Sequence, residues 1–166
     1  MSLEIIRASF TRPADTTIYA AGDLLANSVT PGSVVPIAFT SSNVPCRIQR
    51  VTMLSSNDAV ANKNFTLYLF TAQPTVTNGD NGAFALATQF SALQAVFAST
   101  AAVNTGAGAV NAFYPLDGAA TPQNGWIPQL MPGTFWGLLK VNAAYTPTSG
   151  ETFTLLVEAW ASAGDS

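Results

Sequence analysis

Two apolar runs near the end of the chain alternate with a period of two residues, and this pattern constrains the fold more than any other feature. In Thr134–Val141 the small or apolar residues of one face are Phe135, Gly137, Leu139 and Val141. In 152–160 they are Phe153, Leu155, Val157 and Ala159. Successive side chains of an extended chain point to opposite faces, so each run is predicted as a β-strand with one buried face. Pro147 and Gly150 lie between the runs and favour a turn. We therefore predict a β-hairpin.

Several earlier segments also favour strands. Residues 3–10 alternate, with Ile6 and Phe10 on one face, and are predicted as an edge strand that ends at Arg12-Pro13, because proline removes a ladder donor. Further strands are expected just after Gly22 and over 35–40, 95–100 and 112–116. Phe65–Phe70 is apolar on both faces, which is typical of a strand in the middle of a covered sheet.

The segment 45–54 contains a change of phase. Cys46 and Ile48 share one parity, whereas Val51 and Met53 share the other. One inserted residue near Gln49-Arg50 would restore a single apolar face, which is what a β-bulge does. The alternative is a strand buried on both faces, with the arginines at 47 and 50 reaching solvent through their long stems.

The middle of the chain is more ambiguous. Leu86, Phe90, Leu93 and Phe97 recur at helical spacing, so a short helix is predicted around 84–93, with the strand at 95–100 as its rival. Residues 105–110 and 117–125 are expected to be loops. Eight to nine short strands with frequent turns predict one all-β domain over 1–166, an antiparallel β-sandwich of jelly-roll or immunoglobulin type.

Composition narrows the range of functions. Only 9% of residues are charged, against about 25% in ordinary proteins, so the surface is neutral and rich in Thr, Ser, Asn and Gln. Two interpretations stay open: a virion-type or extracellular domain, or a protein packed against copies of itself or a partner. The net charge of −3 argues against nucleic acid as a partner. The first residues do not resemble a signal peptide and no segment resembles a membrane span, so we expect a soluble protein made in a cytoplasm.

Little in the sequence indicates chemistry. The chain has no histidine, which is the commonest general base, and Cys46 is expected to fill a core position. The nine carboxylates are scattered and mostly lie in turns, where an aspartate bonds its own backbone. A calcium site at Asp80-Asn81 with Asp117 is less favoured than a structural turn. The tryptophans could stack on sugars, but a core or interface role is commoner. We expect no catalysis, no metal and no cofactor.

Three stretches carry a resemblance to a known family. They are FTRPADTTIYAAGD at 10–23, then LYLFTAQPT at 67–75 with NGDNGAF at 78–84, and WGLLKVNAAYTPTSGETF at 136–153. Together they resemble the head decoration, or capsid cement, proteins of tailed bacteriophages. The first stretch is the most specific, and 85–129 is the part least covered.

The resemblance implies a jelly-roll β-sandwich that self-associates as a homodimer or homotrimer. It also implies many copies bound to the major capsid protein on the outside of the virion, with no cofactor and no membrane or nucleic-acid partner. Residues 1–13 would then form an N-terminal arm whose deletion abolishes capsid binding or oligomerisation but leaves the sandwich folded. The residues expected to make contacts are Ile5, Ile6, Phe10, Arg12 and Tyr19. The alternative is a tail-fibre or spike domain that binds host glycan.

Overall fold

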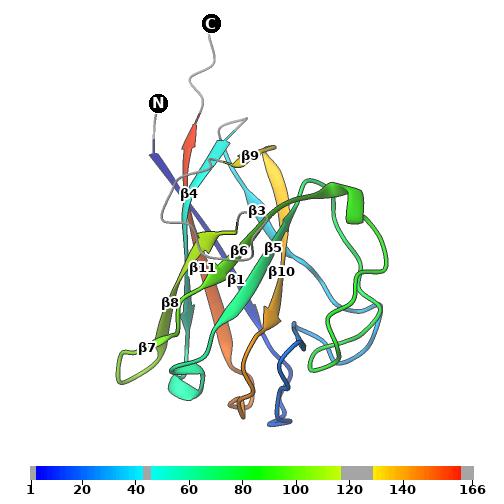
Figure 1. The fold of residues 1–166 in the computed structure, drawn as a ribbon, viewed down its shortest axis with the longest axis vertical. Helices are drawn as coiled ribbons and strands as arrows, with labels where there is room; N and C mark the ends of the chain where they lie inside the picture. The colour runs from blue at the N-terminus through cyan, green and yellow to red at the C-terminus, as the bar shows by residue number, and fades with distance from the viewer. Residues whose placement is uncertain (1–2, 43–45, 117–128, 162–166) are drawn as a thin grey trace, which may run out of the picture.

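The protein is an all-β, antiparallel structure in the computed structural model, which describes residues 3–42, 46–116 and 129–161 (Figure 1). This confirms the predicted all-β, antiparallel class. The strands are β1 (Leu3–Thr11), β2 (Leu24–Leu25), β3 (Ile37–Thr40), β4 (Cys46–Ser55), β5 (Phe65–Phe70), β6 (Leu93–Ser99), β7 (Val103–Asn104), β8 (Ala109–Pro115), β9 (Gln129–Met131), β10 (Thr134–Val141) and β11 (Thr152–Ala161). Two 3-10 helices are present, η1 (Asp58–Val60) and η2 (Phe90–Ala92).

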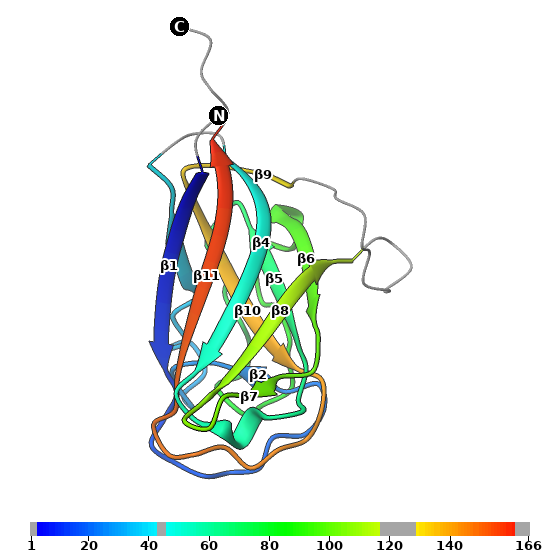
Figure 2. The ribbon, with the colours of Figure 1, turned by 90° about the vertical axis from the view of Figure 1, so that its left-hand side faces the viewer.

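The strands form one strongly curled sheet that folds into two layers. One layer has the order β1-β11-β4-β8, and Figure 2 views it from outside with the other strands behind. The second layer has the order β6-β5-β10, with β2 and β3 both paired to the far side of β10. A short pairing between β6 and β8 joins the layers on one side. On the other side β1 and β3 lie beside each other, and no ladder between them is found among the described residues.

The eight strands of four or more residues pair in a nested order along the chain. The first pairs with the last (β1 with β11), the second with the seventh (β3 with β10), the third with the sixth (β4 with β8) and the fourth with the fifth (β5 with β6). The chain therefore winds as one long doubled-back ribbon, which brings the start of β1 and the end of β11 to the same end of the molecule.

The predicted hairpin between the last two runs is wrong. Both runs are strands with the predicted buried faces, but β10 pairs with β2, β3 and β5, and β11 pairs with β1 and β4. The connection crosses from one layer to the other because it is anchored on the way: Tyr145 is buried and bridges to Tyr19. A period of two identifies the face that a strand buries but says nothing about its partner.

Other local predictions are confirmed. Strand β1 lies at the edge of the sheet. The bulge in β4 lies where expected, because Arg50 opposes Glu158 and Ile48 opposes Ala159, which leaves Gln49 as the extra residue. All four apolar residues around it then face the core: Cys46, Ile48, Val51 and Met53.

The predicted helix at 84–93 is wrong. Leu86 lies in extended backbone that bridges to Val76, and Gln89 has a positive φ of 63°, which an α-helix does not tolerate. A single 3-10 turn follows at η2, and then β6, the strand that was the rival interpretation. The strand expected at 112–116 begins three residues earlier, at Ala109, inside the expected loop. The loop expected at 117–125 lies outside the described residues.

The apolar side chains form two clusters. The larger fills the space between the layers and includes Phe65, Leu67 and Leu69 from β5. The smaller lies on the outer side of β5 and β10, where Phe70 and Leu138 are covered by side chains from the connections around them. Strand β5 is thus buried on both faces, as its sequence predicts.

Candidate interaction site along the first strand

Strand β1 has a ladder partner on only one of its two edges among the described residues. It pairs with β11 from Leu3 opposite Trp160 to Thr11 opposite Thr152, and just beyond it the Arg12 N–H donates to the Glu151 carbonyl at 3.0 Å. Hydrogen-bonded pairs alternate in an antiparallel ladder, so the backbone groups of the odd-numbered residues point away from β11. β1 ends the strand order, so these N–H and C=O groups face the open side. Such an edge is a template for another extended chain.

Strand β3 presents a second edge across from it. The Ser41 N–H donates to the Gly133 carbonyl at 2.7 Å, and by the same alternation Ala38 and Thr40 direct their backbone groups away from β10. Pro36 continues this edge and has no N–H to offer. We call the gap between these two edges the β1–β3 seam.

One end of the seam is held closed by a carboxylate. Glu4 Oε2 accepts a hydrogen bond from Ser41 Oγ at 2.6 Å. Glu4 Oε1 accepts from the Ser42 N–H and from Ser42 Oγ, both at 2.9 Å. These bonds tie β1 to the end of β3 through a side chain instead of a backbone ladder.

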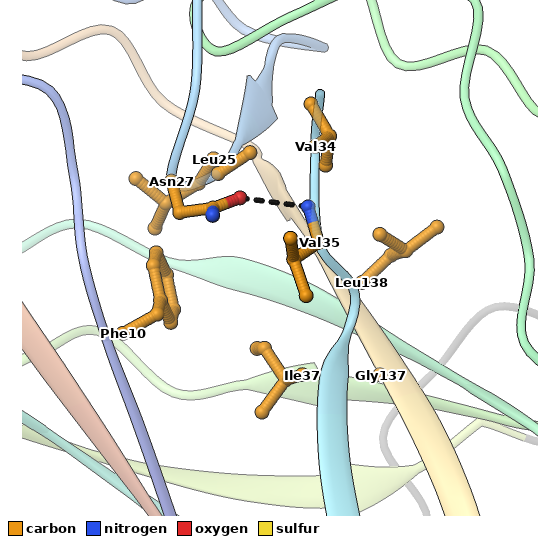
Figure 3. A pocket seen from close by; sticks show the side chains of 9 residues that line it. Phe10, Leu25, Asn27, Val34, Val35, Ile37, Gly137 and Leu138 are labelled. Atoms are coloured by element: carbon orange, nitrogen blue, oxygen red, sulfur yellow. Dashed lines mark hydrogen bonds between the residues drawn. The ribbon is translucent and has the colours of Figure 1, made fainter. Parts of the chain in front are cut away.

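The other end of the seam is open. A groove of about 510 Å³ lies there, between the segments 8–11 and 35–38 with Asn27 beside them. Below it is a small apolar pocket of about 10 Å³, shown in Figure 3, which has room for about one water molecule. Phe10 and Ile37 form part of its wall, and Asn27 Oδ1 accepts a hydrogen bond from the Val35 N–H at 2.9 Å (Figure 3). The pocket is too small for an organic ligand, so the groove itself is the accessible feature.

A buried polar cluster anchors the chain just after β1. The Arg12 side chain is fully buried, and its Nη2 lies 2.9 Å from Asp15 Oδ1 and 3.2 Å from Asp80 Oδ2. Its Nε donates to the Tyr19 hydroxyl at 3.1 Å, and its Nη1 donates to the carbonyls of Asp15 and Thr148 at 2.6 and 3.2 Å. All three guanidinium nitrogens are therefore bonded, and three distant segments are joined at this point.

Asp80 is the second centre of this cluster. Its Oδ1 accepts from the Tyr19 hydroxyl at 2.6 Å and from the Ala26 N–H at 2.7 Å. Burial raises the pKa of Asp80, and the bonds from Tyr19, Ala26 and Arg12 oppose that rise. Burial alone would lower the pKa of Arg12, but its bonds to Tyr19 and Asp15 and the charge on Asp80 outweigh burial and raise it, so the guanidinium stays charged.

Two buried oxygen atoms beside the cluster have no hydrogen-bond partner among the described residues. Glu151 Oε1 accepts from Ser55 Oγ, but Glu151 Oε2 and the Tyr145 hydroxyl have no hydrogen-bond partner among the described residues. Burial raises the pKa of Glu151, because the charged carboxylate is removed from water and the bond from Ser55 only partly offsets this. Burial also raises the pKa of Tyr145, and the nearby charge on Glu151 adds to the rise.

The structure separates the five residues predicted to make contacts. Ile5 points outward and is 62% exposed, whereas Ile6 points inward and is buried. Phe10 is half-buried, stacks on Phe153 at 5.4 Å and lines the groove. Arg12 and Tyr19 lie inside the buried cluster. Only Ile5 and part of Phe10 are therefore available to a partner.

The structure does not support the expectation that the fold survives loss of residues 1–13. That deletion would remove the neighbour of β11, the buried Ile6 and the Arg12 side chain, and would leave Asp80 buried without its cation. Strand β1 is thus an integral part of the sheet with an exposed edge, and its role in contacts has to be tested by substitutions on the exposed side.

No pattern in the sequence indicates the buried roles of Asp80 and Glu151. Asp80 lies in an Asn-Gly-Asp-Asn-Gly stretch, which favours a turn aspartate bonded to its own backbone, and that interpretation is wrong for it. It fits Asp15, whose Oδ1 accepts from the Thr17 N–H at 3.0 Å. Because Arg12 and Tyr19 already occupy the Asp80 carboxylate, it is not arranged as a calcium ligand. Asp117, its expected companion, lies outside the described residues.

The described residues hold no arrangement typical of catalysis or metal binding. No group of three or more Cys, Asp or Glu side chains among them is placed to hold a metal ion. Cys46 is buried, and burial raises the pKa of its thiol, which disfavours the reactive thiolate. Trp136 on β10 and Trp160 on β11 lie in different layers and form no shared platform, and Trp126 is outside the described residues. Within the described part of the chain, no helix is long and apolar enough to cross a membrane.

Comparison with known proteins identifies no relative of this chain. No family model matches this chain. Searches of curated proteins and of solved structures find no match either. The functional argument therefore rests on the residues and on the geometry of β1 and its surroundings.

Proposed function

We propose that this protein is a structural virion component that binds the outside of a tailed-phage capsid and cements or decorates the lattice of the major capsid protein. The observation that carries the proposal is the presentation of β1. This nine-residue strand has an edge with no ladder partner among the described residues, and it exposes the apolar side chains of Leu3 and Ile5 on a chain with few charges to keep partners away. Such a surface suits association with protein, and the buried polar cluster is closed to substrates.

The strand order supports the same proposal. Nested pairing of eight strands in two facing layers is the winding of a jelly roll, and we propose that the fold belongs to this type. The stretch 10–23, on which the resemblance to cement proteins most depends, contains Arg12, Asp15 and Tyr19. These residues build the buried cluster, so the resemblance involves side chains that hold the fold together.

A cement protein acts by linkage. If it binds the expanded lattice and not its precursor, it stabilises that state by its binding free energy at each site, summed over many sites. Self-association as a dimer or trimer would let one unit bridge several capsid subunits and add avidity. No cofactor is required for this action.

Copy number in the virion tests the proposal. The protein would be quantified by mass spectrometry against the major capsid protein in purified particles of the phage that encodes it. We expect hundreds of copies in a simple ratio to the capsid subunit. About a dozen copies would contradict decoration and place the protein on a tail or spike, and absence from the particle would contradict any virion role.

A further inference from the structure

The outward face of the β1, β11 and β4 layer differs in charge from the rest of the molecule. Three of the six cations of the chain, Arg7, Arg47 and Arg50, are exposed there, and Glu158 is the only carboxylate on this face among the described residues. The described residues of this face therefore carry a net charge of +2, in a chain whose net charge is −3. Figure 2 views this face directly, with the three strands side by side.

The register of the strands brings these arginines next to apolar side chains. Leu3, Trp160 and Arg47 form one row across β1, β11 and β4. Ile5, Glu158 and Arg50 form the next row. Leu3 is 51% exposed and Trp160 is partly exposed, so this end of the face is apolar and cationic at once. We call Leu3, Ile5, Arg7, Arg47, Arg50 and Trp160 the arginine face.

Only part of this charge is compensated. Arg50 forms a salt bridge with Glu158, but neither Arg7 nor Arg47 takes part in a salt bridge with any described residue. The other end of the same face is different. Ser9 bonds Thr154 at 2.8 Å and Thr11 bonds Thr152 at 2.9 Å, so its polar groups are satisfied within the sheet. The exposed apolar side chains, and an arginine without a salt bridge to any described residue, therefore lie together at the end that carries Leu3 and Arg47.

We propose that the arginine face is the surface by which this protein docks onto an acidic patch of a partner protein, and, resting on the proposed function, that the partner is the outer surface of the major capsid protein. Guanidinium groups bind carboxylates through two parallel hydrogen bonds, and arginine with large apolar residues is enriched in protein interfaces. Two uncompensated arginines on a chain of net charge −3 fall short of the cationic stripe that nucleic-acid backbones require.

The test uses two charge-reversal variants with equal net charge. One carries Arg7→Glu and Arg47→Glu, and the control carries Lys63→Glu and Lys140→Glu. Lys63 precedes β5, and Lys140 lies on β10 in the other layer. All four side chains lie at least partly in solvent, so both variants should melt close to the wild type. Binding would be measured by cosedimentation with expanded capsids prepared without this protein, at low and at moderate salt.

The proposal expects the arginine variant to lose at least about tenfold in affinity at low salt, and the lysine variant to stay within about twofold of the wild type. Equal losses of affinity in both variants would overturn the proposed docking role of the arginine face, whereas the proposal that the protein binds capsids would stand. A wild type that does not bind capsids would overturn the proposed function and the docking proposal with it. Binding of the wild type, but not of the arginine variant, to a short DNA duplex at about 150 mM salt would overturn a protein partner for this face.

Discussion

The buried cluster can be tested with two tyrosines that differ in one respect. Tyr19 and Tyr145 are both buried, and their rings stack with centroids 5.1 Å apart. The Tyr19 hydroxyl donates to Asp80 at 2.6 Å and accepts from Arg12 at 3.1 Å, whereas the Tyr145 hydroxyl has no partner among the described residues. Replacing each with phenylalanine keeps the ring and removes only the oxygen, so the pair compares the hydrogen bonds directly.

The size of the difference follows from these contacts. A hydrogen bond to a charged group contributes about 1.5–3 kcal/mol, and Tyr19→Phe removes one to a carboxylate and one to a guanidinium. Asp80 keeps its bonds from Ala26 and Arg12, so the loss should lie near the low end of the sum, about 3 kcal/mol. Tyr145→Phe removes a buried hydroxyl that has no hydrogen-bond partner among the described residues, so it should be neutral or stabilising by up to about 1 kcal/mol.

Chemical and thermal unfolding would measure both changes. For a chain of this size about 3 kcal/mol corresponds to a fall of about 6–12 °C in Tm for Tyr19→Phe, with little change or a small rise for Tyr145→Phe. The urea m-value should stay constant, since neither change alters the surface exposed on unfolding. Equal losses for the two variants, or a Tyr19→Phe loss below about 0.5 kcal/mol, would refute the view that this network stabilises the fold.

Three further predictions concern other parts of the molecule. The raised pKa of Glu151 means that the folded state holds a proton that the unfolded state releases, so stability should fall as pH rises from the ordinary glutamate pKa through the raised one. In Glu151→Gln, melting curves recorded from acid to neutral pH should show a smaller fall than in the wild type, because only the raised pKa of Asp80 still contributes one. Gly137→Ala should cost about 1–3 kcal/mol in urea unfolding, because a Cβ there would lie 2.9 Å from Phe39 Cε2 in the core. Deleting Gln49 should leave a folded protein by circular dichroism, because it removes only the bulge residue, whereas deleting Thr52 should unfold the chain by reversing the faces of the strand.

Local features of the fold could be predicted because they depend on neighbouring residues. Alternation predicted which residues of β1, β10 and β11 share a face, and the change of phase placed the bulge near Gln49-Arg50, where the structure has it. Pairing could not be predicted in the same way. The hairpin prediction failed because a proline and a glycine between two strands are compatible with a crossing between layers as well as with a tight turn. The crossing depends on long-range contacts of the connection, such as the buried Tyr145 against Tyr19 and the Thr148 carbonyl against Arg12.

The cluster around Arg12 shows why the site was harder to predict than the fold. Alternation correctly places Ile5 and Ile6 on opposite faces of β1, but it does not say which face is buried, and both were expected to make contacts although Ile6 lies in the core. Alternation gives no reason to bury an arginine, because its partners Asp80 and Thr148 lie 68 and 136 positions away in the sequence. Burial of a charged residue depends on long-range pairs that a single sequence does not display.

The winding of the chain also explains why an open edge lies at β1. Among the eight longer strands, the nested pairs are joined to one another by the pairing of β11 with β4, of β8 with β6 and of β5 with β10, which leaves β1 and β3 with one partner each among these eight. These two strands lie beside each other and would complete a closed barrel if they paired. Pro36 removes a donor from the β3 edge, and Glu4 joins the strands at one end through side-chain bonds to Ser41 and Ser42 instead of a ladder. These residues thus disfavour a backbone ladder between β1 and β3, which would otherwise cover both exposed edges. A protein whose role is to associate with others has a use for such an edge, whereas stability alone would favour its loss.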